Sequence, residues 1–330
     1  MTIGIVGLGS MGKRRIRLLQ KIDAGFSLVG IDAREDRREE AQKLYGITVS
    51  EDLEKAIEEH GIQAVVVSTS PLSHGGIIKT ALQKNCHVFT ELNLVEDLYE
   101  ENMRLAEQNG RVLFLSSTMM FREEIGFISR EVGKSSLPVN YSYHVGQFLP
   151  TWHSWESYKD FFVANKRTNG CREVFAIELP WLIKAFGKIE SCQVLKGRMT
   201  DLDLDYPDNF EVLVSHENGN RGTLNINVAS QFAVRNLEVY GQQCYMRWGG
   251  TPDSLLQYEQ ESGGLKKIAL YDETEQINSQ NRSIIEDAYE MELREFIGAI
   301  QDGLRPRYSF EEDREVLHLI DHIEGAGNDD

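Results

Sequence analysis

Three glycines close to the N-terminus form the clearest chemical motif in the sequence. They lie in the stretch Gly7-Leu8-Gly9-Ser10-Met11-Gly12, which matches the pattern G-x-G-x-x-G. An apolar run precedes the motif and an amphipathic run follows it, as in a strand, a tight turn and a helix. In that context, backbone N–H groups and the positive end of the helix dipole hold a dinucleotide pyrophosphate. We therefore predict cofactor contacts from five residues of this turn: Gly7, Gly9, Ser10, Met11 and Gly12.

An acidic residue, Asp32, follows the second apolar run, Phe26–Ile31. A carboxylate at this position accepts hydrogen bonds from ribose hydroxyls, and its charge repels a 2′-phosphate. The pattern therefore favours NAD over NADP as the cofactor. Arg34 and Arg37 lie just beyond Asp32, and NADP stays open as an alternative because an arginine there can bind a 2′-phosphate.

Polar residues also follow two later apolar runs. The run Ala64–Ser68 ends in Ser68-Thr69-Ser70-Pro71, and the run His87–Thr90 ends at Glu91. Ligands of open parallel sheets bind beyond the carboxyl ends of the strands. We therefore expect cofactor contacts from Ser68, Thr69, Pro71 and Glu91. Glu91 is also a candidate acid or base for catalysis, the alternative being a carboxylate that only positions the cofactor.

Apolar and amphipathic runs alternate through the first part of the chain. This order predicts a doubly wound Rossmann domain with a parallel sheet over residues 1–120. Farther on, between Ile189 and Ala269, strands follow one another through tight turns such as Glu217-Asn218-Gly219-Asn220. We predict an α+β domain over residues 121–330, with a large, mostly antiparallel open sheet that helices cover on one face. We expect its C-terminal helices to pack back on the first domain.

Composition narrows the range of partners. The 330 residues carry a net charge of −17, which argues against nucleic acid and anionic membrane surfaces as partners. Four cysteines lack the spacing of a zinc site, so we expect free thiols and no metal. The first strand begins at residue 2, and no apolar run could span a bilayer. We therefore expect a cytoplasmic protein.

The order of these segments resembles the Gfo/Idh/MocA family of oxidoreductases over nearly the whole chain. The resemblance rests on Gly4–Gly12, Thr69-Ser70-Pro71 with His74, Val88-Phe89-Thr90-Glu91, and Phe296–Phe310 leading into Glu311-Glu312-Asp313. It implies an NAD- or NADP-dependent reaction at a hydroxyl or carbonyl of a sugar or cyclitol. It also implies that His74 lies beside the cofactor and that the protein forms a homodimer or homotetramer through the open sheet.

Two departures from the family pattern concern catalysis. Glu91-Leu92-Asn93 stands where relatives carry Glu-Lys-Pro, and the helix after Gly170 lacks their histidine. Leucine cannot polarise or protonate an oxygen as the lysine does. In the family this helix faces the nicotinamide, which puts Glu173 at the place of an aspartate and Ile177 at that of the histidine. Arg172 and Glu173 are therefore candidates for substrate binding and proton transfer, the alternative being a surface ion pair.

Two more candidate regions follow from the residues alone. Glu178 lies in the otherwise apolar stretch Phe175–Trp181, where a buried carboxylate needs a partner, so we count it as a possible catalytic group. Leu149–Asn169 is a long aromatic segment without a regular pattern, which is typical of a lid or binding wall. It offers His153 as an acid or base. Its aromatic and basic side chains either contact substrate or anchor the loop: Trp152, Trp155, Tyr158 and Lys166.

The leading hypothesis is an NAD(P)-dependent oxidoreductase acting on a hydroxyl or carbonyl of a polyhydroxylated small molecule. A sugar, a cyclitol and a nucleotide-sugar-like compound all suit the resemblance. Leu92 and the missing histidine motivate a second hypothesis, a non-catalytic or decayed NAD-binding regulatory protein. A third is an NAD-assisted glycosidase, because a minority of the family cleaves glycosides in that way.

Overall fold

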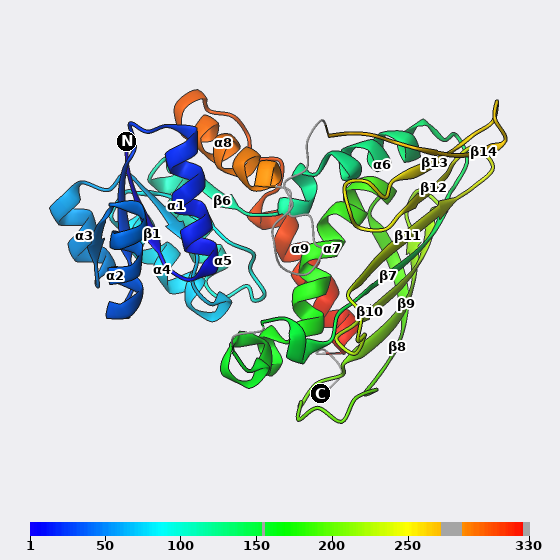
Figure 1. Ribbon diagram of the computed structural model, residues 1–330, viewed down its shortest axis with the longest axis horizontal. Helices are drawn as coiled ribbons and strands as arrows, with labels where there is room; N and C mark the ends of the chain where they lie inside the picture. The colour runs from blue at the N-terminus through cyan, green and yellow to red at the C-terminus, as the bar shows by residue number, and fades with distance from the viewer. Residues whose placement is uncertain (154–155, 272–285, 326–330) are drawn as a thin grey trace. The chain divides into compact units, whose positions relative to one another are not determined.

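The computed structural model describes residues 1–153, 156–271 and 286–325. It divides into two compact units, which are drawn in Figure 1. Unit 1 contains Met1–Thr118 and Asp287–Leu317, and unit 2 contains Met119–Glu286 and His318–Asp330. The first division falls at Thr118, close to the predicted boundary at residue 120. A C-terminal segment, 287–317, belongs to the first unit.

Unit 1 is a doubly wound α/β fold, as predicted. Its six strands are parallel and lie in the order β3-β2-β1-β4-β5-β6. The strands are β1 (Thr2–Val6), β2 (Ser27–Ile31), β3 (Thr48–Ser50), β4 (Ala64–Val67), β5 (His87–Thr90) and β6 (Leu113–Leu115). The helices between them are α1 (Ser10–Ile22), α2 (Glu35–Tyr45), α3 (Leu53–His60), α4 (Pro71–Gln83) and α5 (Tyr99–Gln108), and α8 (Glu286–Asp302) joins them from the C-terminal part of the chain.

The apolar runs of the sequence form the buried centre of this sheet. β1 pairs with β2 on one side and with β4 on the other, so the strand order reverses beside β1. The carboxyl ends of parallel strands share one edge of a sheet, and the reversal point of that edge is where such folds bind ligands. Gly7, Asp32, Ser68 and Glu91 each follow one of these strands directly. The fold therefore gathers the predicted cofactor residues along one edge.

Unit 2 contains a large open sheet. Its eight strands lie in the order β14-β13-β12-β11-β7-β10-β9-β8, and only β7 and β10 pair in parallel. They are β7 (Asn140–Gly146), β8 (Ile189–Gly197), β9 (Asn209–His216), β10 (Arg221–Asn227), β11 (Val234–Tyr240), β12 (Tyr245–Trp248), β13 (Leu256–Glu259) and β14 (Gly264–Lys267). The predicted hairpins β9–β10, β11–β12 and β13–β14 are all present. The mostly antiparallel sheet is therefore confirmed.

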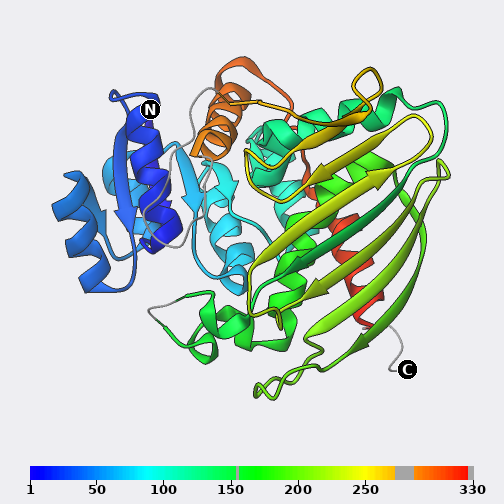
Figure 2. The same ribbon diagram turned by 45° about the vertical axis from the view of Figure 1, so that its right-hand side comes forward.

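Helices of unit 2 cover one face of this sheet. α6 (Glu123–Lys134) and α7 (Gly170–Phe186) lie on that face, whereas no described helix of the unit covers the other (Figures 1 and 2). Burial alternates along the strands accordingly: Tyr141, Tyr143 and Val145 of β7 are buried, and Asn140 and Ser142 are exposed. This alternation is the expected pattern for a sheet with one covered face.

One glycine fixes how β7 and β10 pack. Gly222 is paired with Tyr141, and a Cβ atom on Gly222 would lie 2.0 Å from Cζ of the tyrosine ring. The ring therefore occupies the space that any side chain at position 222 would need. The Tyr141 hydroxyl lies 3.0 Å from Nε2 of the buried His216, which joins β7 to the end of β9.

The segment that connects β7 to α7 is more regular than its sequence suggests. Its described residues form four short 3-10 helices, at Leu149–Thr151, Tyr158–Asp160, Phe162–Ala164 and Lys166–Thr168. α7 then begins after Asn169, whose Oδ1 accepts a hydrogen bond from Arg172 N at 2.8 Å, and it continues through Pro180. The last helix, α9 (Phe310–Glu324), contains the division between Leu317 and His318. No helix of the described residues is long and apolar enough to cross a bilayer.

Candidate functional site

Close backbone contacts shape the glycine turn between β1 and α1. Gly7 has a left-handed backbone, with φ at +91°, and its N–H donates to Ile31 O at 2.8 Å. A Cβ atom on Gly12 would lie 1.9 Å from Gly7 O. A side chain is therefore excluded at both positions, at Gly7 by backbone conformation and at Gly12 by the contact between helix and strand.

Gly9 differs because its missing side chain leaves open space. Among the described residues, a Cβ atom there would meet only Arg37 Nη1, at 3.8 Å. Gly9 is the N-cap of α1, where no side chain caps the helix and no acidic residue stands in the first turn. Ser10 and Met11 follow as the first helical residues. The positive, N-terminal end of the α1 dipole is therefore available to an anion. The open space at Gly9 and this uncapped helix end together fit the pyrophosphate of NAD.

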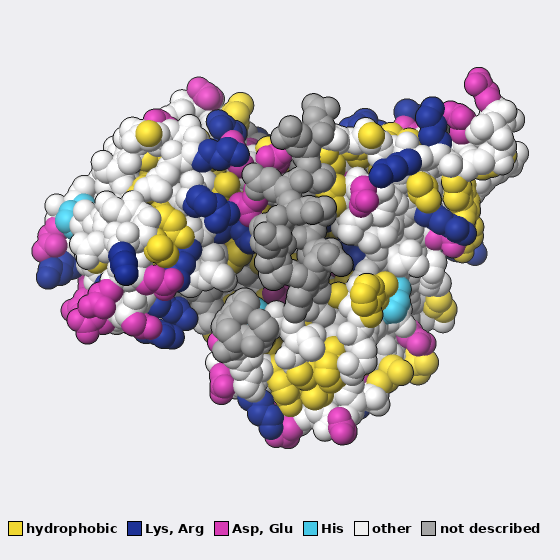
Figure 3. Space-filling model, viewed as in Figure 1, with side chains coloured by type: hydrophobic (Ala, Val, Ile, Leu, Met, Phe, Trp, Pro, Cys, Tyr) yellow, Lys and Arg dark blue, Asp and Glu magenta, His cyan; other side chains and the backbone are white. Residues whose placement is uncertain are grey.

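Asp32 is held in place by two backbone groups. Its Oδ2 accepts from Leu8 N at 2.8 Å, and its Oδ1 accepts from Arg34 N at 2.9 Å. Each carboxylate oxygen keeps a further lone pair for a ribose hydroxyl. The Arg34 side chain turns to Asp36 instead, with two contacts of 3.1 and 2.6 Å. Figure 3 shows other places on unit 1 where basic side chains, in dark blue, lie next to acidic side chains, in magenta.

The loop after β4 presents a buried hydroxyl group. Ser68 Oγ has no hydrogen-bond partner among the described residues, although it is shielded from solvent. An orphaned hydroxyl of this kind at the ligand-binding edge of the sheet fits a polar contact with the cofactor. Thr69 is tied to the following turn, because its Oγ1 lies 2.7 Å from Ser73 Oγ. Pro71 is the first residue of α4.

His74 joins the loop after β4 to the residues after β5. Its Nε2 lies 3.0 Å from Thr69 O and its Nδ1 2.7 Å from Asn93 Oδ1. Burial lowers the pKa of His74, which favours the neutral ring. A neutral ring carries one N–H, which donates either from Nε2 to Thr69 O or from Nδ1 to Asn93 Oδ1. His74 thus links the loop after β4 to Asn93.

Glu91 belongs to a buried ionic cluster that the sequence did not indicate. Arg15 of α1 binds it through two contacts, Nε–Oε1 at 2.6 Å and Nη2–Oε2 at 3.0 Å. The same guanidinium binds Glu292 of α8 at 2.9 Å and lies 4.5 Å from the centre of the Phe89 ring. Burial raises the pKa of Glu292, and Arg15 opposes that shift. Leu92, the next residue in the chain, is half-buried and has no ionisable group.

Glu173 carries an unusual carboxyl group in unit 2. It lies in the first turn of α7, and its Oε2 is buried without a hydrogen-bond partner among the described residues. Burial raises the pKa of Glu173 to about 7, from an ordinary value of 4.5. A carboxyl group in this state takes up or releases a proton near neutral pH. The neighbouring Ile177 offers no polar group.

Arg172, by contrast, is committed to the protein. Its Nη1 lies 2.5 Å from Glu324 Oε2 and 2.8 Å from Asp321 Oδ1, and the side chain is buried. Asn169 Nδ2 also donates to Glu324, at 2.7 Å. These contacts join the start of α7 to the end of α9. They favour a structural role for Arg172 over the predicted substrate contact.

Glu178 is the acceptor of a second buried cluster. Arg235 binds its Oε1 through Nε at 3.0 Å and Nη2 at 2.6 Å, and Oε2 accepts from Tyr143 and Trp181 at 2.7 Å each. Both carboxylate oxygens are thus fully engaged, and the side chain is 1% exposed. The partner that a buried carboxylate requires is present. This environment favours a structural ion pair over the predicted catalytic role.

The residues of the segment Leu149–Asn169 that were predicted to contact substrate or move a proton lie at different places along it. His153 Nδ1 lies 2.8 Å from Glu156 Oε1, and its ring stacks on Phe161 at 4.4 Å. Trp152 donates to Gln147 O at 3.2 Å and is half-buried, as is Tyr158. Lys166 is exposed. Trp155 lies outside the described residues. Among the residues that are described, no cluster of His, Cys, Asp and Glu could hold a metal ion.

The arrangement so far defines a class of protein: a two-unit protein whose first unit is built to hold a dinucleotide. The model of the "Oxidoreductase family, NAD-binding Rossmann fold" matches residues 1–117. Residues 1–117, about a third of the chain, are thus similar to the Gfo/Idh/MocA family, and NAD is the cofactor that the glycine turn and Asp32 of unit 1 fit.

Individual relatives match this chain over a shorter stretch or at a lower sequence identity. Myo-inositol 2-dehydrogenase of Thermotoga maritima is 30% identical over 108 residues, 32% of this chain and 32% of that protein. Human (Homo sapiens) biliverdin reductase A is 27% identical over 191 residues, 56% of this chain and 58% of that protein. The chain therefore covers less than two thirds of either relative.

A solved oxidoreductase from Agrobacterium radiobacter, in complex with NAD+, L-tartaric acid and magnesium, shares the fold with a TM-score of 0.82. It is 13% identical, and the match covers 99% of this chain and 97% of that structure.

Proposed function

We propose that the protein is an NAD-dependent oxidoreductase that acts on a hydroxyl or carbonyl of a polyhydroxylated small molecule, with Glu173 as its proton-transfer group. The observation that carries the proposal is the carboxyl of the half-buried Glu173, whose Oε2 is buried without a partner among the described residues and whose pKa is raised to about 7. The resemblance to the Gfo/Idh/MocA family implies that the helix of Glu173 faces the nicotinamide. A group that titrates near neutral pH is suited to act as both acid and base.

In the oxidation direction, the ionised Glu173 carboxylate accepts the proton of the substrate hydroxyl. The bound nicotinamide would supply the other half of the chemistry by accepting the hydride from the carbinol carbon. In the reduction direction, the protonated Glu173 donates to the carbonyl oxygen. A carboxyl group with an ordinary pKa would be almost wholly ionised at neutral pH and would serve only the first direction.

Glu91 has a different role in this proposal. Arg15 neutralises and orients its carboxylate at the carboxyl end of β5, where nucleotide-binding sheets present groups to the cofactor. Both oxygens of the Glu91 carboxylate are bound by the fully buried Arg15 guanidinium, so the group is engaged with the protein. We therefore propose that Glu91 positions the cofactor and that Glu173 moves the proton. His153, Trp152, Tyr158 and Lys166 remain candidates for substrate contacts.

A non-catalytic NAD-binding protein is the second proposal, and Leu92 is the observation that favours it. Leu92 replaces the family's lysine with a side chain that cannot move a proton. The two proposals differ in what Glu173 does. A buried carboxyl oxygen without a hydrogen-bond partner lowers the stability of the folded protein. A non-catalytic protein would gain nothing in return for keeping such a group.

The discriminating experiment measures NADH at 340 nm with a panel of compounds. The panel contains myo-inositol and its stereoisomers, simple sugars, nucleotide sugars and L-tartrate, together with biliverdin assayed for NADH consumption. Turnover on one compound, lost in Glu173→Gln and kept in the matched control Glu190→Gln, supports the proposal. NADH binding without turnover on the whole panel supports the non-catalytic protein. Tightly bound NAD with release of a sugar and no net NADH would support an NAD-assisted glycosidase.

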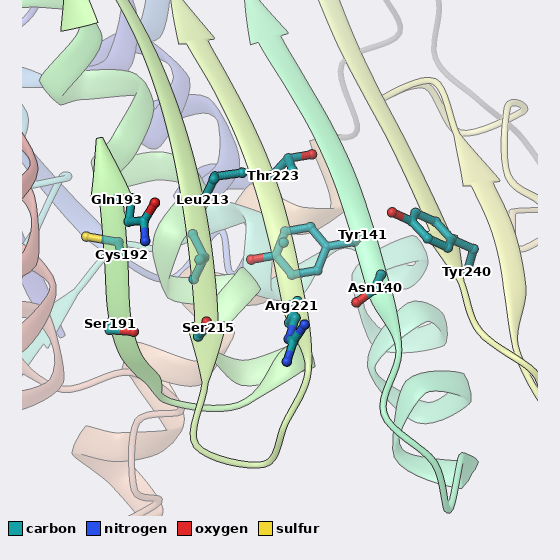
Figure 4. Close-up of a pocket in the computed structure, with 12 residues that line it drawn as sticks. Asn140, Tyr141, Ser191, Cys192, Gln193, Leu213, Ser215, Arg221, Thr223 and Tyr240 are labelled. Carbon is teal, nitrogen blue, oxygen red and sulfur yellow. The ribbon is translucent and has the colours of Figure 1, made fainter. Parts of the chain in front are cut away.

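We also propose that the protein self-associates through the open face of the unit 2 sheet. A hollow of about 370 Å³ lies on this face and is lined by residues of five strands, β7 to β11. Figure 4 shows its lining residues, among them Gln193, Leu213 and Tyr240. On the same face, Leu195 and Leu213 are 69% and 55% exposed. A second copy of the chain would cover them, as the family resemblance implies.

The test of self-association is the molar mass in solution by light scattering. Leu213→Glu places a charge on the open face and is expected to produce a monomer. Leu44→Glu is the matched control, because Leu44 is 58% exposed on α2 of unit 1. A monomeric unmodified protein, or an unchanged mass in Leu213→Glu, would contradict this proposal.

A further inference from the structure

Asn93 is a buried amide beyond the end of β5 to which the proposed chemistry gives no role. Its side chain lies against His74 of α4, and both residues are 2% exposed. Asn93 Oδ1 lies 2.7 Å from His74 Nδ1, and Thr90 Oγ1 lies 3.3 Å from the same nitrogen. A buried polar contact of this kind is costly to break, because each group left without a partner keeps its desolvation cost. The contact therefore fixes the His74 ring against the end of β5.

The fixed ring in turn holds the second half of the loop Ser68–Pro71, here called the β4 loop. Ser68 N donates to a carbonyl of β1 at 2.8 Å, so the sheet itself holds the first residue of the loop. From Thr69 onward the chain has left the sheet, and Thr69 O lies 3.0 Å from His74 Nε2. The two ring nitrogens of His74 thus join the β4 loop on one side to Asn93 on the other.

The order of the strands places the β4 loop beside one half of the cofactor. The sheet runs β3-β2-β1-β4-β5-β6, Asp32 follows β2 and the glycine turn follows β1. Asp32 fits the adenosine ribose and the glycine turn fits the pyrophosphate. A dinucleotide that continues in the same direction passes the carboxyl ends of β4 and β5 with its nicotinamide half. The β4 loop and Asn93 both lie at these ends.

We propose that Asn93 is a positioning residue for the nicotinamide half of the cofactor, on which it acts through His74 and the β4 loop. An amide suits this role because its oxygen accepts and its nitrogen donates. One orientation of the group therefore satisfies His74 Nδ1 whichever ring nitrogen carries the proton. Nothing in the role requires Asn93 to touch the cofactor. The inference rests on the cofactor binding of the proposed function and is independent of Glu173 and of any turnover.

The test compares NADH with ADP-ribose, which keeps both riboses and both phosphates but lacks the nicotinamide. In calorimetric titrations, Asn93→Ala is expected to weaken NADH binding about five- to tenfold, which corresponds to the loss of one hydrogen bond. The affinity for ADP-ribose should change by less than about twofold, because Asp32 and the glycine turn keep their contacts.

Asn102→Ala is the matched control. Asn102 is a fully buried asparagine of the same unit, and its Nδ2 donates at 3.0 Å to the backbone oxygen of Gly75, the residue after His74 in α4. Both alanine variants remove a buried amide contact with α4, so both should lower the melting temperature. Only Asn93→Ala should change the affinity for NADH. A merely structural role for Asn93 would change the melting temperature alone.

His74→Ala tests the same link from its other end and replaces Asn93→Ala if that variant does not fold. It should show the same loss of NADH affinity and the same small change for ADP-ribose. In the His74→Ala background, adding Asn93→Ala should weaken NADH binding by less than about a further twofold, because the link is already broken.

Equal losses of NADH and ADP-ribose affinity in Asn93→Ala would show general damage to unit 1 and overturn the inference. So would an unchanged NADH affinity in Asn93→Ala, an equal NADH loss in Asn102→Ala, or fully additive losses in the double variant. An unmodified protein that binds neither NADH nor ADP-ribose would contradict the cofactor binding itself. No turnover enters these measurements, so failure of the positioning role and failure of the proposed activity are distinguishable.

Discussion

Glu173→Gln is expected to stabilise the protein while removing its activity. The substitution keeps the shape of the side chain and replaces a carboxyl that titrates near pH 7 with a neutral amide. An unfolded chain has an ordinary glutamate pKa of about 4.5, so the folded state binds the proton more tightly. The difference between 4.5 and about 7, at about 1.4 kcal/mol per pH unit, corresponds to about 3 kcal/mol.

The direction of the pH dependence follows from the raised pKa. Below pH 4.5 the carboxyl is protonated in both states, and Glu173 imposes no electrostatic cost on folding. Between pH 4.5 and about 7 the unfolded state loses its proton first, so the unmodified protein loses stability as the pH rises. Above pH 7 Glu173 is ionised in both states, and the full destabilisation of the folded state is present. The glutamine variant avoids it, so the two proteins should have equal unfolding free energies near pH 4.5 and differ by about 3 kcal/mol at pH 8.

The assay is urea unfolding at several pH values, followed by tryptophan fluorescence. All four tryptophans lie between residues 152 and 248, in the same unit as Glu173, so the signal reports on the relevant unit. Glu190→Gln, which removes an exposed carboxylate from β8, is the matched control and should track the unmodified protein at every pH. A glutamine variant that shows no increasing advantage between pH 5 and 8 would refute the reasoning, because Glu173 would then have an ordinary pKa.

Three further predictions concern the rest of the molecule. Gly9→Ala should fold normally but bind NADH at least about tenfold more weakly, because its methyl group enters space meant for the pyrophosphate, whereas Gly12→Ala should also lower the melting temperature. Glu178→Ala should cost about 2–4 kcal/mol in urea unfolding by leaving the half-buried Arg235 and the buried hydroxyl of Tyr143 and indole N–H of Trp181 without their acceptor, with little change in NADH affinity. Arg15→Met should leave Glu91 and Glu292 without their shared cation and lower the free energy of unfolding in urea; because burial raises the pKa of Glu292 and Arg15 opposes that shift, the loss should grow with pH as Glu292 ionises.

Short-range patterns predicted the framework of the fold correctly. The glycine turn, the alternation of strands and helices, and the hairpin at Glu217–Asn220 are each encoded within a few residues. Local patterns were less exact about single residues. Ser50 is a plausible cap for the helix that follows it, but the cap of α3 is Asp52, whose Oδ1 accepts from Lys55 N at 2.8 Å.

Long-range pairs could not be predicted from the sequence. Arg15 meets Glu91 and Glu292, which lie 76 and 277 residues away, so no local spacing indicates the cluster. The sequence did show that Glu178 would need a partner, but it could not identify Arg235, which is 57 residues farther along the chain. The absence of a partner for Glu173 Oε2 is equally invisible in sequence, since it depends on what the fold places around it.

The proton-transfer role of Glu173 is tested most directly by the pH dependence of kcat/KM on any panel compound that reacts. The unmodified protein should show an ionisation near pH 7 in this profile, assigned to the free enzyme. Glu173→Gln should lower kcat/KM by about a hundredfold or more and should remove that ionisation, with the dissociation constant of NADH unchanged. A glutamine variant that keeps both the rate and the ionisation would contradict the account and show that another group moves the proton.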